Sequence, residues 1–277
     1  MIPKKIHYCW FGGNPLPEMA QKCIESWRKY CPDYEIIEWN EDNFDISCND
    51  YVKEAYEAKK WAFVTDYARL KVIYENGGIY FDTDVEVIRP IDSLLYGVDA
   101  FFAMESPGVI ATGLGFGAKK GNSIVKALMD DYNDIHFLLE DGSYDLTACP
   151  KRNEDVFASL GFVHTDELQK IGNAVFYPHD YFCPKSWETG YKINLTPNTA
   201  CIHHFNASWY NDTEKKRLEE FKFRMKRRQE FHERYGEEKG EKKYRRWERL
   251  RRKYYYLRTH GLLHTIKIII YKLLGKI

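Results

Sequence analysis

The sequence predicts an α/β protein, in which helices pack on the faces of a sheet, followed by a helical C-terminal extension. Two observations lead to this prediction. Strand-like and helix-like segments alternate through the first half of the chain, as they do in α/β domains. After Asp212 this alternation stops and a basic, helix-like pattern replaces it. We therefore expect one domain over residues 1–212 and a basic, amphipathic helical extension over residues 213–277.

The N-terminal segment predicts a strand, a helix and a second strand. Lys5–Phe11 is short, aromatic and β-prone, and Gly12 and Gly13 follow it as a loop would. Pro17–Tyr30 has apolar residues at helical spacing, and Glu35–Trp39 has the pattern of the next strand. The chain thus begins as a β-α-β unit.

The central segment predicts a helix in two pieces that leads into an acidic strand end. Tyr51–Glu75 has a helical pattern, and Gly77 stands where a C-terminal cap is expected. The strand Ile79–Phe81 follows, and two aspartates come directly after it. Further strands are expected at Phe101–Met104 and Leu114–Ala118, and a further helix at Ser123–Tyr132.

The C-terminal extension combines positive charge with apolar residues. From Thr213 onward, 22 Lys and Arg stand against 9 Asp and Glu, a net charge of +13; because the formal total is zero, the rest carries −13. Glu214–Tyr235 predicts a charged helix that Gly236 ends, Lys242–Arg258 is a second basic stretch, and Leu262–Leu274 is apolar. Three interpretations compete: a solvated helical face, a nucleic-acid surface, or an anchor on an anionic membrane. The acidic charge of the rest of the chain and the lack of a groove-reading motif weigh against nucleic acid. We favour the membrane, because basic and aromatic residues suit an anionic headgroup layer.

Composition and cysteine usage narrow the class of protein. With 44% hydrophobic and 16% aromatic residues, the chain is not a disordered protein. Its seven cysteines form no CxxC pair, and the N-terminus enters a strand pattern without a secretory signal, which indicates reduced thiols. No run of about 18 or more apolar residues is present, so we expect no segment to span a bilayer. The expected location is the cytoplasm, at the inner face of a membrane.

Asp82-Thr83-Asp84 is the first candidate for chemistry. Ligands of α/β sheets bind beyond the carboxyl ends of the strands, where these residues fall. Two carboxylates one residue apart can share a hard cation such as Mg²⁺ or Mn²⁺, which completes its shell with phosphate oxygens. Taken alone, the pair also fits a solvated turn.

Two further groups of residues strengthen the metal interpretation. Asp66 and Arg69 share one face of the preceding helix, where they are either an ordinary surface pair or ligands for sugar hydroxyls and phosphate oxygens. Far downstream, the run from His203 to Trp209 contains a histidine pair followed by a serine and a tryptophan. A lone histidine is more often structural, but this combination in a loop is suited to closing a site.

The string from Asp66 to Asp84, D-x-x-R-x-x-x-I-Y-x-x-G-G-x-Y-x-D-x-D, resembles glycosyltransferase family 32. That family includes yeast mannosyltransferases and bacterial enzymes of capsule and polysaccharide synthesis. The run Ile6–Gly13 resembles the first strand of this family and of the related large clostridial glucosylating toxins. His204-x-x-x-Ser208-Trp209 resembles the family's closing motif, so the resemblance covers roughly the first 210 residues.

The resemblance implies a GT-A fold, which is Rossmann-like and binds a nucleotide sugar, a divalent cation (Mn²⁺ or Mg²⁺), and transfer with retention of configuration. It implies catalytic roles for Asp66, Arg69, Asp82 and Asp84. The implied metal ligands are Asp82, Asp84 and His204, with His203 as the alternative. The implied donor-binding residues are Trp10, which would stack on the base, Phe11, Asp66, Arg69, Tyr80, Asp82, Ser208 and Trp209.

The expected reaction moves a hexose or N-acetylhexosamine from a UDP-sugar, or from GDP-mannose, to a glycan or lipid-linked saccharide in polysaccharide or capsule synthesis. The cation, Ser208 and Trp209 would stabilise charge on the leaving diphosphate. No nucleophile is evident, so we favour attack from the leaving-group side, assisted by a β-phosphate oxygen. Asn153, Glu154 and Asp155 are either acceptor-side residues or the start of a helix.

Two other classes of function compete with this one. A non-catalytic nucleotide-sugar-binding module would not need both aspartates, Arg69 and the His-Ser-Trp run at once. A metal-dependent phosphoesterase could use the same carboxylates, but normally has more acidic ligands around two cations.

Overall fold

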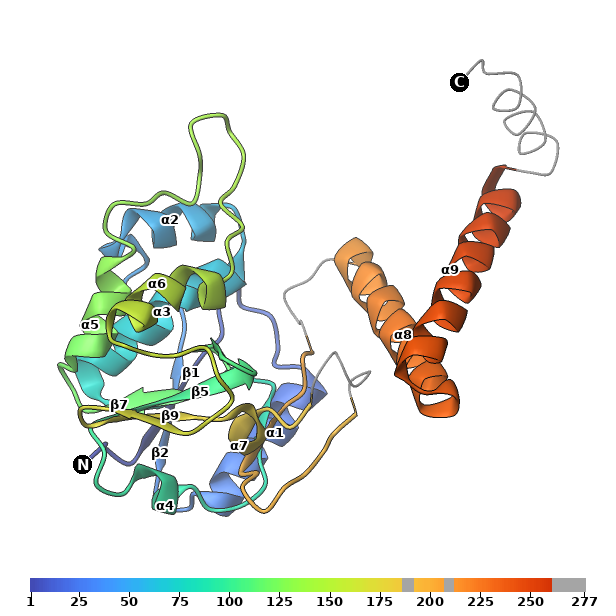
Figure 1. The fold of residues 1–277 in the computed structure, drawn as a ribbon. Coiled ribbons are helices and arrows are strands. Elements are labelled where there is room, and N and C mark those ends of the chain that lie inside the picture. Colours follow the sequence, from blue (N-terminus) through green and yellow to red (C-terminus); the bar gives the residue numbers. More distant parts are fainter. Residues whose placement is uncertain (186–191, 207–211, 261–277) are drawn as a thin grey trace. The chain divides into compact units, whose positions relative to one another are not determined.

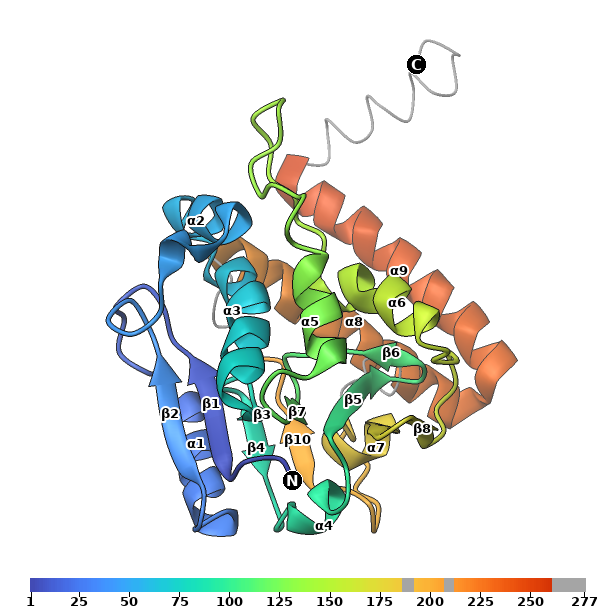
Figure 2. The ribbon, with the colours of Figure 1, turned by 90° about the vertical axis from the view of Figure 1, so that its left-hand side faces the viewer.

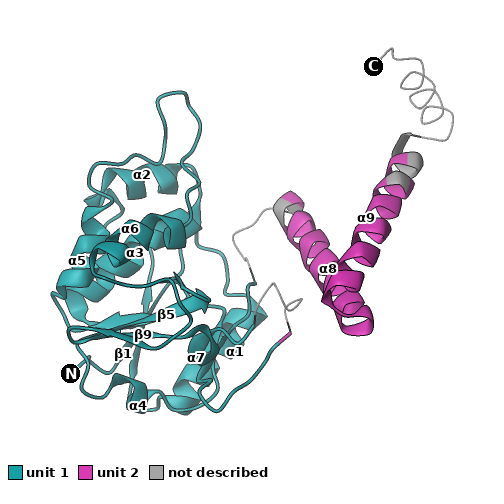
Figure 3. Ribbon diagram, viewed as in Figure 1, with its two compact units in different colours: residues 1–186, 193–212 teal, residues 187–192, 213–277 magenta. Residues whose placement is uncertain are grey.

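The computed structural model describes residues 1–185, 192–206 and 212–260. The chain divides into two compact units, coloured separately in Figure 3. Unit 1 comprises Met1–Ser186 and Ile193–Asp212, and unit 2 comprises Trp187–Lys192 and Thr213–Ile277. Each unit is described by itself.

Unit 1 is built on a mixed sheet whose strands mostly run in one direction (Figure 1). The strand order is β2-β1-β3-β7-β5-β9-β8, and β6 pairs with the free part of β5. Strands β2, β1 and β3 are parallel, β7 runs against both of its neighbours, β5 and β9 are parallel, and β8 is antiparallel. The bounds are β1 Lys5–Cys9, β2 Glu35–Trp39, β3 Gly78–Tyr80, β5 Ala100–Ser106, β6 Val109–Ile110, β7 Phe116–Ala118, β8 Gln169–Ile171 and β9 Ala174–Tyr177. A separate two-stranded sheet pairs β4 (Val85–Val87) with β10 (Cys201–His203).

Helices cover both faces of the large sheet (Figures 1 and 2). One face carries α2 (Asp50–Glu57), α3 (Trp61–Asn76), α5 (Ser123–Asp130) and α6 (Cys149–Ser159). The other carries α1 (Glu18–Tyr30), α4 (Asp92–Leu95) and α7 (His179–Phe182). A short 3-10 turn, η1 (Ile46–Cys48), precedes α2.

The strands supply alternate side chains to two hydrophobic cores. Tyr80 and Phe102 belong to the core beneath α3. Their neighbours Ile79, Phe81 and Phe101 point the other way, into the core beneath α1 and α7. This follows from the period-two alternation of side chains along a strand, and explains why both faces need a helical cover.

The predicted α/β class is confirmed by this sheet and its helices. The strand predicted at Glu35–Trp39 has those bounds, and the predicted two-piece helix is α2 followed by α3. Gly77 caps α3 as predicted: its φ is +66°, and its N–H donates to the carbonyl of Ile73 at 2.8 Å. The sequence analysis missed β8, β9 and β10, because strands of three or four residues show too few alternations to be recognised. It gave a helix start at Asn153 as one alternative, whereas α6 begins at Cys149.

Unit 2 consists mainly of two long helices, α8 (Asp212–Tyr235) and α9 (Glu237–His260). Gly236, with φ of +76°, separates them, and its N–H donates to the carbonyl of His232 at 2.9 Å. Phe231 on α8 packs against Tyr244 and Trp247 on α9, with ring centroids 6.5 and 6.4 Å away. The helices therefore form a hairpin with an aromatic seam. The apolar stretch Leu262–Leu274 lies outside the described residues, within which no helix is long and apolar enough to cross a membrane.

Candidate functional site

Three parallel strands end at one edge of the sheet in unit 1. Trp10 follows β1, Asn40 follows β2, and Asp82 comes two residues after the end of β3. Because the carboxyl ends of parallel strands meet at one edge, these side chains lie at the same mouth. The sheet thus brings the aromatic N-terminal segment and the acidic pair together.

Asp66, Arg69 and Asp82 form a charged cluster at this edge, in which Asp66 and Arg69 are buried and Asp82 is partly exposed. Arg69 Nη2 lies 3.0 Å from Asp66 Oδ1 and 3.6 Å from Asp82 Oδ1. Arg69 is only 4% exposed and Asp66 7%, so the pair is not the surface pair that its spacing also allowed. Tyr80, under the guanidinium, donates its hydroxyl to Asp82 Oδ1 at 2.9 Å. Since unpaired buried charge is costly, the cluster is held in place by its own electrostatics.

Gly113 makes the close approach of this cluster possible. A Cβ at Gly113 would stand 2.2 Å from Asp82 Oδ2 and 2.6 Å from Arg69 Nη1. The backbone also holds Asp82 here, because its N–H donates to the carbonyl of Gly113 at 2.8 Å. Nothing in the sequence pattern marked this glycine, because only the fold brings residue 113 against residues 69 and 82.

The two buried members of the cluster, Asp66 and Arg69, have shifted pKa values. Burial raises the pKa of Asp66 to about 6, and the charge of Asp82 adds to this, while Arg69 opposes it. For Arg69, burial would lower the pKa, but Asp82 and Asp66 outweigh it and hold the pKa above its ordinary range. Arg69 therefore stays charged and presents a fixed cation at the mouth.

Asp84 occupies a second, partly buried position beside β10. Its Oδ1 lies 3.4 Å from Nε2 of His203, and its Oδ2 accepts the N–H of Asn206 at 2.7 Å. Burial would raise the pKa of Asp84, but His203 and these donors outweigh it and lower the pKa to about 2. The carboxylate is therefore ionised at any physiological pH.

The structure places His203, and not His204, beside Asp84. His204 Nε2 instead lies 2.8 Å from Oε2 of Glu86. The reason is the end of β10: successive side chains of a strand point to opposite sides, so one histidine of the pair faces the site and the other turns away. The expectation that His204 supplies a metal ligand is corrected accordingly, and His203 takes its place as the neighbouring imidazole.

Glu105 is an acid of the site that the sequence analysis did not single out. It lies on β5, where the pairing with β6 shifts register between Met104 and Ser106, and such bulges redirect a side chain. Burial raises the pKa of Glu105, and the nearby charges of Asp84 and Asp82 raise it further. The sequence motifs did not include Glu105, because only the fold brings it near the aspartates.

The acidic residues suit a hard cation in their chemistry. Asp82, Asp84 and Glu105 bring three carboxylates into one region: burial raises the pKa of Glu105, and the charges of the two aspartates add to this increase. Carboxylate oxygens are the ligands that Mn²⁺ and Mg²⁺ prefer. Within the described residues, however, no three His, Cys, Asp or Glu side chains are arranged closely enough to hold a metal ion.

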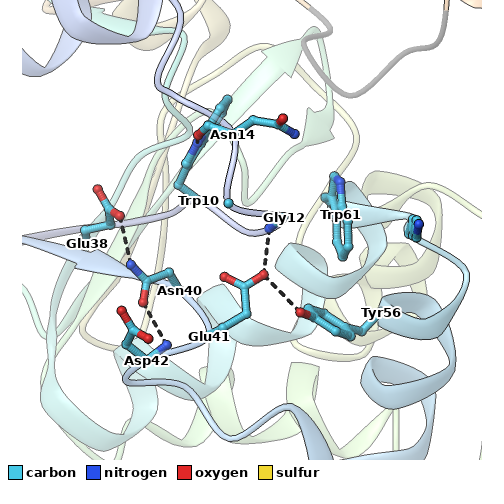
Figure 4. Close-up of a pocket in the computed structure, with 11 residues that line it drawn as sticks. Trp10, Gly12, Asn14, Glu38, Asn40, Glu41, Asp42, Tyr56 and Trp61 are labelled. Carbon is cyan, nitrogen blue, oxygen red and sulfur yellow. Dashed lines mark hydrogen bonds between the residues drawn. The ribbon is translucent and has the colours of Figure 1, made fainter.

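A cavity of about 820 Å³ opens at the same edge of the sheet, at the ends of β1 and β2 (Figure 4). Trp10 and Trp61 stand at its sides, and Glu41 accepts the N–H of Gly12 at 2.7 Å and the hydroxyl of Tyr56 at 3.1 Å. Its wall is acidic and aromatic, which suits a ring with N–H and O–H donors better than a phosphate. The lining residues are Trp10, Gly12, Gly13, Asn14, Glu38, Asn40, Glu41, Asp42, Tyr56, Lys59 and Trp61.

Phe11 does not share this cavity with Trp10. It is 4% exposed and packs edge-on against Phe44 in the core, with ring centroids 5.8 Å apart. The expectation that Phe11 contacts the donor is corrected, because adjacent residues leaving a strand point in opposite directions. Ser208 and Trp209 lie outside the described residues.

Asn153 is fully buried near the cluster, although it was predicted as either an acceptor-side residue or a helix start. It is the fifth residue of α6, whose N-cap is Ala148, so it does not begin the helix. Both polar atoms of its amide lack a hydrogen-bond partner in the described structure. The neighbours Glu154, which pairs with Lys151, and Asp155 lie on the outer side of the helix. An unsatisfied buried amide is costly, so Asn153 is an unusual polar residue in this part of unit 1.

The comparison with known families agrees with this site. Residues 17–99 match the family described as "Glycosyltransferase sugar-binding region containing DXD motif". The matched segment includes Asp66, Arg69, Asp82 and Asp84. Residues 17–99 are therefore similar to the glycosyltransferase sugar-binding region with a DXD motif, and the predicted resemblance is confirmed.

Parts of the chain are also similar to named proteins of two different kinds. One is "Inositol phosphoceramide mannosyltransferase 3" of Schizosaccharomyces pombe, 33% identical over 129 residues, which are 44% of this chain and 34% of that protein. Another is "Subversion of eukaryotic traffic protein A" of Legionella pneumophila, 26% identical over 160 residues, which are 47% of this chain and 24% of that protein. The chain thus spans about a third or less of the length of these relatives.

Among solved structures, a glycosyltransferase involved in the glycosylation of the major capsid of PBCV-1 is similar, with a TM-score of 0.43 and 15% sequence identity. The superposition covers 80% of this chain and all of that one. The family match supports transferase activity in the glycosyltransferase class.

Proposed function

We propose that this protein is a retaining glycosyltransferase of the GT-A type that uses a nucleotide-sugar donor. The observation that carries the proposal is the Asp66–Arg69–Asp82 cluster with its buried guanidinium, at the edge of the sheet where the aromatic cavity also opens. A surface that merely bound sugar would not need to bury a guanidinium between two carboxylates. The segment that bears the cluster is the one that matches the DXD family.

In this proposal the donor lies across the mouth, with its base in the cavity and its sugar over the cluster. Trp10 stacks on the base, and the cavity carboxylates accept its N–H groups and the ribose hydroxyls. Asp66 and Arg69 contact the donor sugar, and Tyr80 orients Asp82. We favour a UDP-sugar, with GDP-mannose as the second candidate.

Asp82 and Asp84 would hold Mn²⁺ or Mg²⁺, with His203 beside them. When bound, the cation would supply positive charge against the leaving diphosphate. The chain's own residues do the rest of the positioning. Arg69 offers a charged donor that needs no reorganisation, and Asn153 offers its unsatisfied amide to a sugar hydroxyl of the donor or acceptor. Ser208 and Trp209 remain proposed donors to the diphosphate.

We propose that residues 1–212 form the catalytic domain and residues 213–277 a basic extension. The acceptor would be a glycan or lipid-linked saccharide in polysaccharide or capsule synthesis. A lipid-linked acceptor would give the extension a purpose: it would hold the enzyme at the cytoplasmic face of a membrane where that acceptor lies.

The test is release of free nucleotide from UDP-sugars and GDP-mannose in the presence of Mn²⁺, together with thermal shifts by the same donors. We expect one of these nucleotide sugars to raise the melting temperature of the protein. The same nucleotide sugar should be hydrolysed slowly to free nucleotide and sugar. Trp10→Ala should raise the donor KM about tenfold or more, whereas Trp10→Phe, which keeps a stacking ring, should change it less. Release of phosphate from simple phosphoesters, without donor hydrolysis, would identify a phosphoesterase instead.

A further inference from the structure

The outer face of α9 is a row of exposed cations. Lys239, Lys242, Arg246 and Arg249 follow one another at spacings of three and four, which places them on one side of the helix. All four are exposed. We call these four residues the outer stripe.

The opposite side of α9 faces the seam with α8. Tyr244 is 5% exposed there, and Trp247 packs against Phe223 with ring centroids 6.0 Å apart. Arg251 pairs with Glu220 of α8, and Arg224 of α8 lies 3.2 Å from Glu248. The aromatic seam and these cross-pairs fix which side of α9 is turned outward.

The acids of unit 2 neutralise arginines other than those of the outer stripe. Glu241 contacts Arg228 at 2.8 Å and Arg245 at 2.9 Å. Glu248 contacts Arg252 at 3.1 Å. Within the outer stripe only Lys242 has an acidic partner, Glu238, at 2.7 Å. In the part of the chain that the structure describes, no carboxylate pairs with Lys239, Arg246 or Arg249.

Large apolar side chains adjoin these unneutralised cations. Leu250, four residues after Arg246 and next to Arg249, is 58% exposed, and Tyr254, four residues further on, is 66% exposed. Exposed aliphatic and aromatic side chains beside Lys and Arg are typical of a helix that lies on a membrane surface. A solvated helical face has no need of them.

We propose that the outer stripe, together with Leu250 and Tyr254, is the surface that docks on an anionic phospholipid bilayer. The cations would contact lipid phosphates, and Leu250 and Tyr254 would enter the boundary between headgroups and acyl chains. This rests on the proposed membrane location and gives it a particular face. Nucleic acid presents phosphates too, but it offers an aliphatic side chain such as Leu250 nothing comparable.

The full-length chain offers a matched pair of double variants for the test. Arg246→Gln with Arg249→Gln removes two charges from the outer stripe. Arg245→Gln with Arg252→Gln removes two charges from the same helix, but these arginines pair with Glu241 and Glu248. Helix content measured by circular dichroism establishes that both proteins are folded.

Binding is measured by co-sedimentation with vesicles of phosphatidylcholine alone and of phosphatidylcholine mixed with phosphatidylglycerol. We expect the wild type to bind the mixed vesicles only, the outer-stripe variant to bind them about 30-fold more weakly, and the Arg245/Arg252 variant to lose much less. Equal losses in the two variants, or no binding of the wild type to anionic vesicles, would overturn the proposal. Binding to duplex RNA is measured as well. The proposal would also be overturned if the outer-stripe variant lost affinity for duplex RNA but kept its binding to vesicles.

Donor hydrolysis in solution separates this proposal from the proposed function. Residues of the outer stripe lie in unit 2, whereas the residues proposed to bind the donor belong to unit 1. The outer-stripe variant should therefore hydrolyse the donor at the wild-type rate. If the wild type docks on anionic vesicles but hydrolyses no donor, the glycosyltransferase proposal fails and the docking surface stands.

Discussion

The two units of this protein use the same arginine side chain in opposite ways. In unit 1, Arg69 is buried and lies between Asp66 and Asp82, at 3.0 and 3.6 Å. In unit 2, Arg246 is exposed and no described carboxylate pairs with it. Burial makes Arg69 a fixed charge in a low dielectric, where each partner matters. Exposure makes Arg246 a screened charge that acts only together with its neighbours.

The difference shows that the spacing of charged residues in the sequence does not by itself reveal whether an ion pair is buried or exposed. The Asp66–Arg69 spacing is that of an ordinary helix pair, and so is the Glu241–Arg245 spacing. The first pair lies at the mouth of the sheet and the second on a helical hairpin. The contrast predicts large effects of changes in unit 1 and small ones in unit 2.

The largest effect should come from the acid at the proposed cation site. Asp84→Asn removes a charge whose pKa of about 2 keeps it ionised, and should lower donor hydrolysis by about 10²–10³-fold. Glu86→Gln, a neighbouring acid that is 41% exposed and pairs with His204, is the control and should leave the rate near wild type. A folded Asp84→Asn protein with near wild-type hydrolysis would show that this carboxylate is not part of the reaction.

The second effect concerns stability and pH in unit 1. His7 is fully buried, lies 2.9 Å from the Gly77 carbonyl through Nε2, and accepts the Trp39 N–H at Nδ1. Burial lowers its pKa from 6.5 to about 4. The folded state therefore binds fewer protons, so stability is full above pH 6.5 and falls as the pH drops toward 4, by about 3 kcal/mol.

Urea unfolding at several pH values between 7 and 4 measures this loss against the variant His7→Gln. Glutamine can keep a donor for Gly77 and an acceptor for Trp39 but does not titrate, so its profile should be flatter. Parallel profiles for the two proteins would mean that His7 does not contribute the pH dependence.

A third effect, of intermediate size, should come from filling the space that Gly113 leaves next to the charged cluster. Gly113→Ala would put a methyl group 2.2 Å from Asp82 Oδ2, so the cluster must shift. We expect a loss of about 1–3 kcal/mol in stability and a marked fall in donor hydrolysis. Gly121→Ala, at a φ of +71° with nothing within 4 Å, should cost stability without slowing hydrolysis. If the two variants behaved alike, Gly113 would matter only for folding.

The smallest effect should come from the charge network of unit 2. Burial alone would raise the pKa of Glu241, but hydrogen bonds from Arg228, Arg245 and His232 outweigh it and lower the pKa to about 2. Its stabilisation is therefore present above about pH 4.5 and lost as the pH falls toward 2. Glu241→Gln should cost about 1 kcal/mol at neutral pH, and the difference from wild type should shrink in acid.

Thermal unfolding followed by circular dichroism measures this effect, with Glu238→Gln as the control. Glu238 is 86% exposed and has one partner, Lys242, so its loss should change stability less. If Glu241→Gln lowered the free energy of unfolding as much as protonation of His7 does, charged groups in the two units would not differ in their effect on stability.

Local signals predicted the framework of the fold well. The helix that Gly77 caps, the strand Glu35–Trp39 and the break at Gly236 follow from periodicity and backbone preference, which act over a few residues. The short strands β8, β9 and β10 could not be predicted this way. Their pairing with distant strands stabilises them, rather than their own few residues.

The candidate site also has some features that local sequence predicts and others that depend on tertiary structure. The sequence by itself determined that Asp66, Arg69, Asp82 and Asp84 belong together, because the motif sets their order and spacing. Tertiary structure alone decided that His203 rather than His204 faces Asp84, that Phe11 enters the core, and that Glu105 joins the acids. The physical reason is that spacing along the chain limits what can meet, whereas the direction of each side chain depends on strand pleat, bulge and packing.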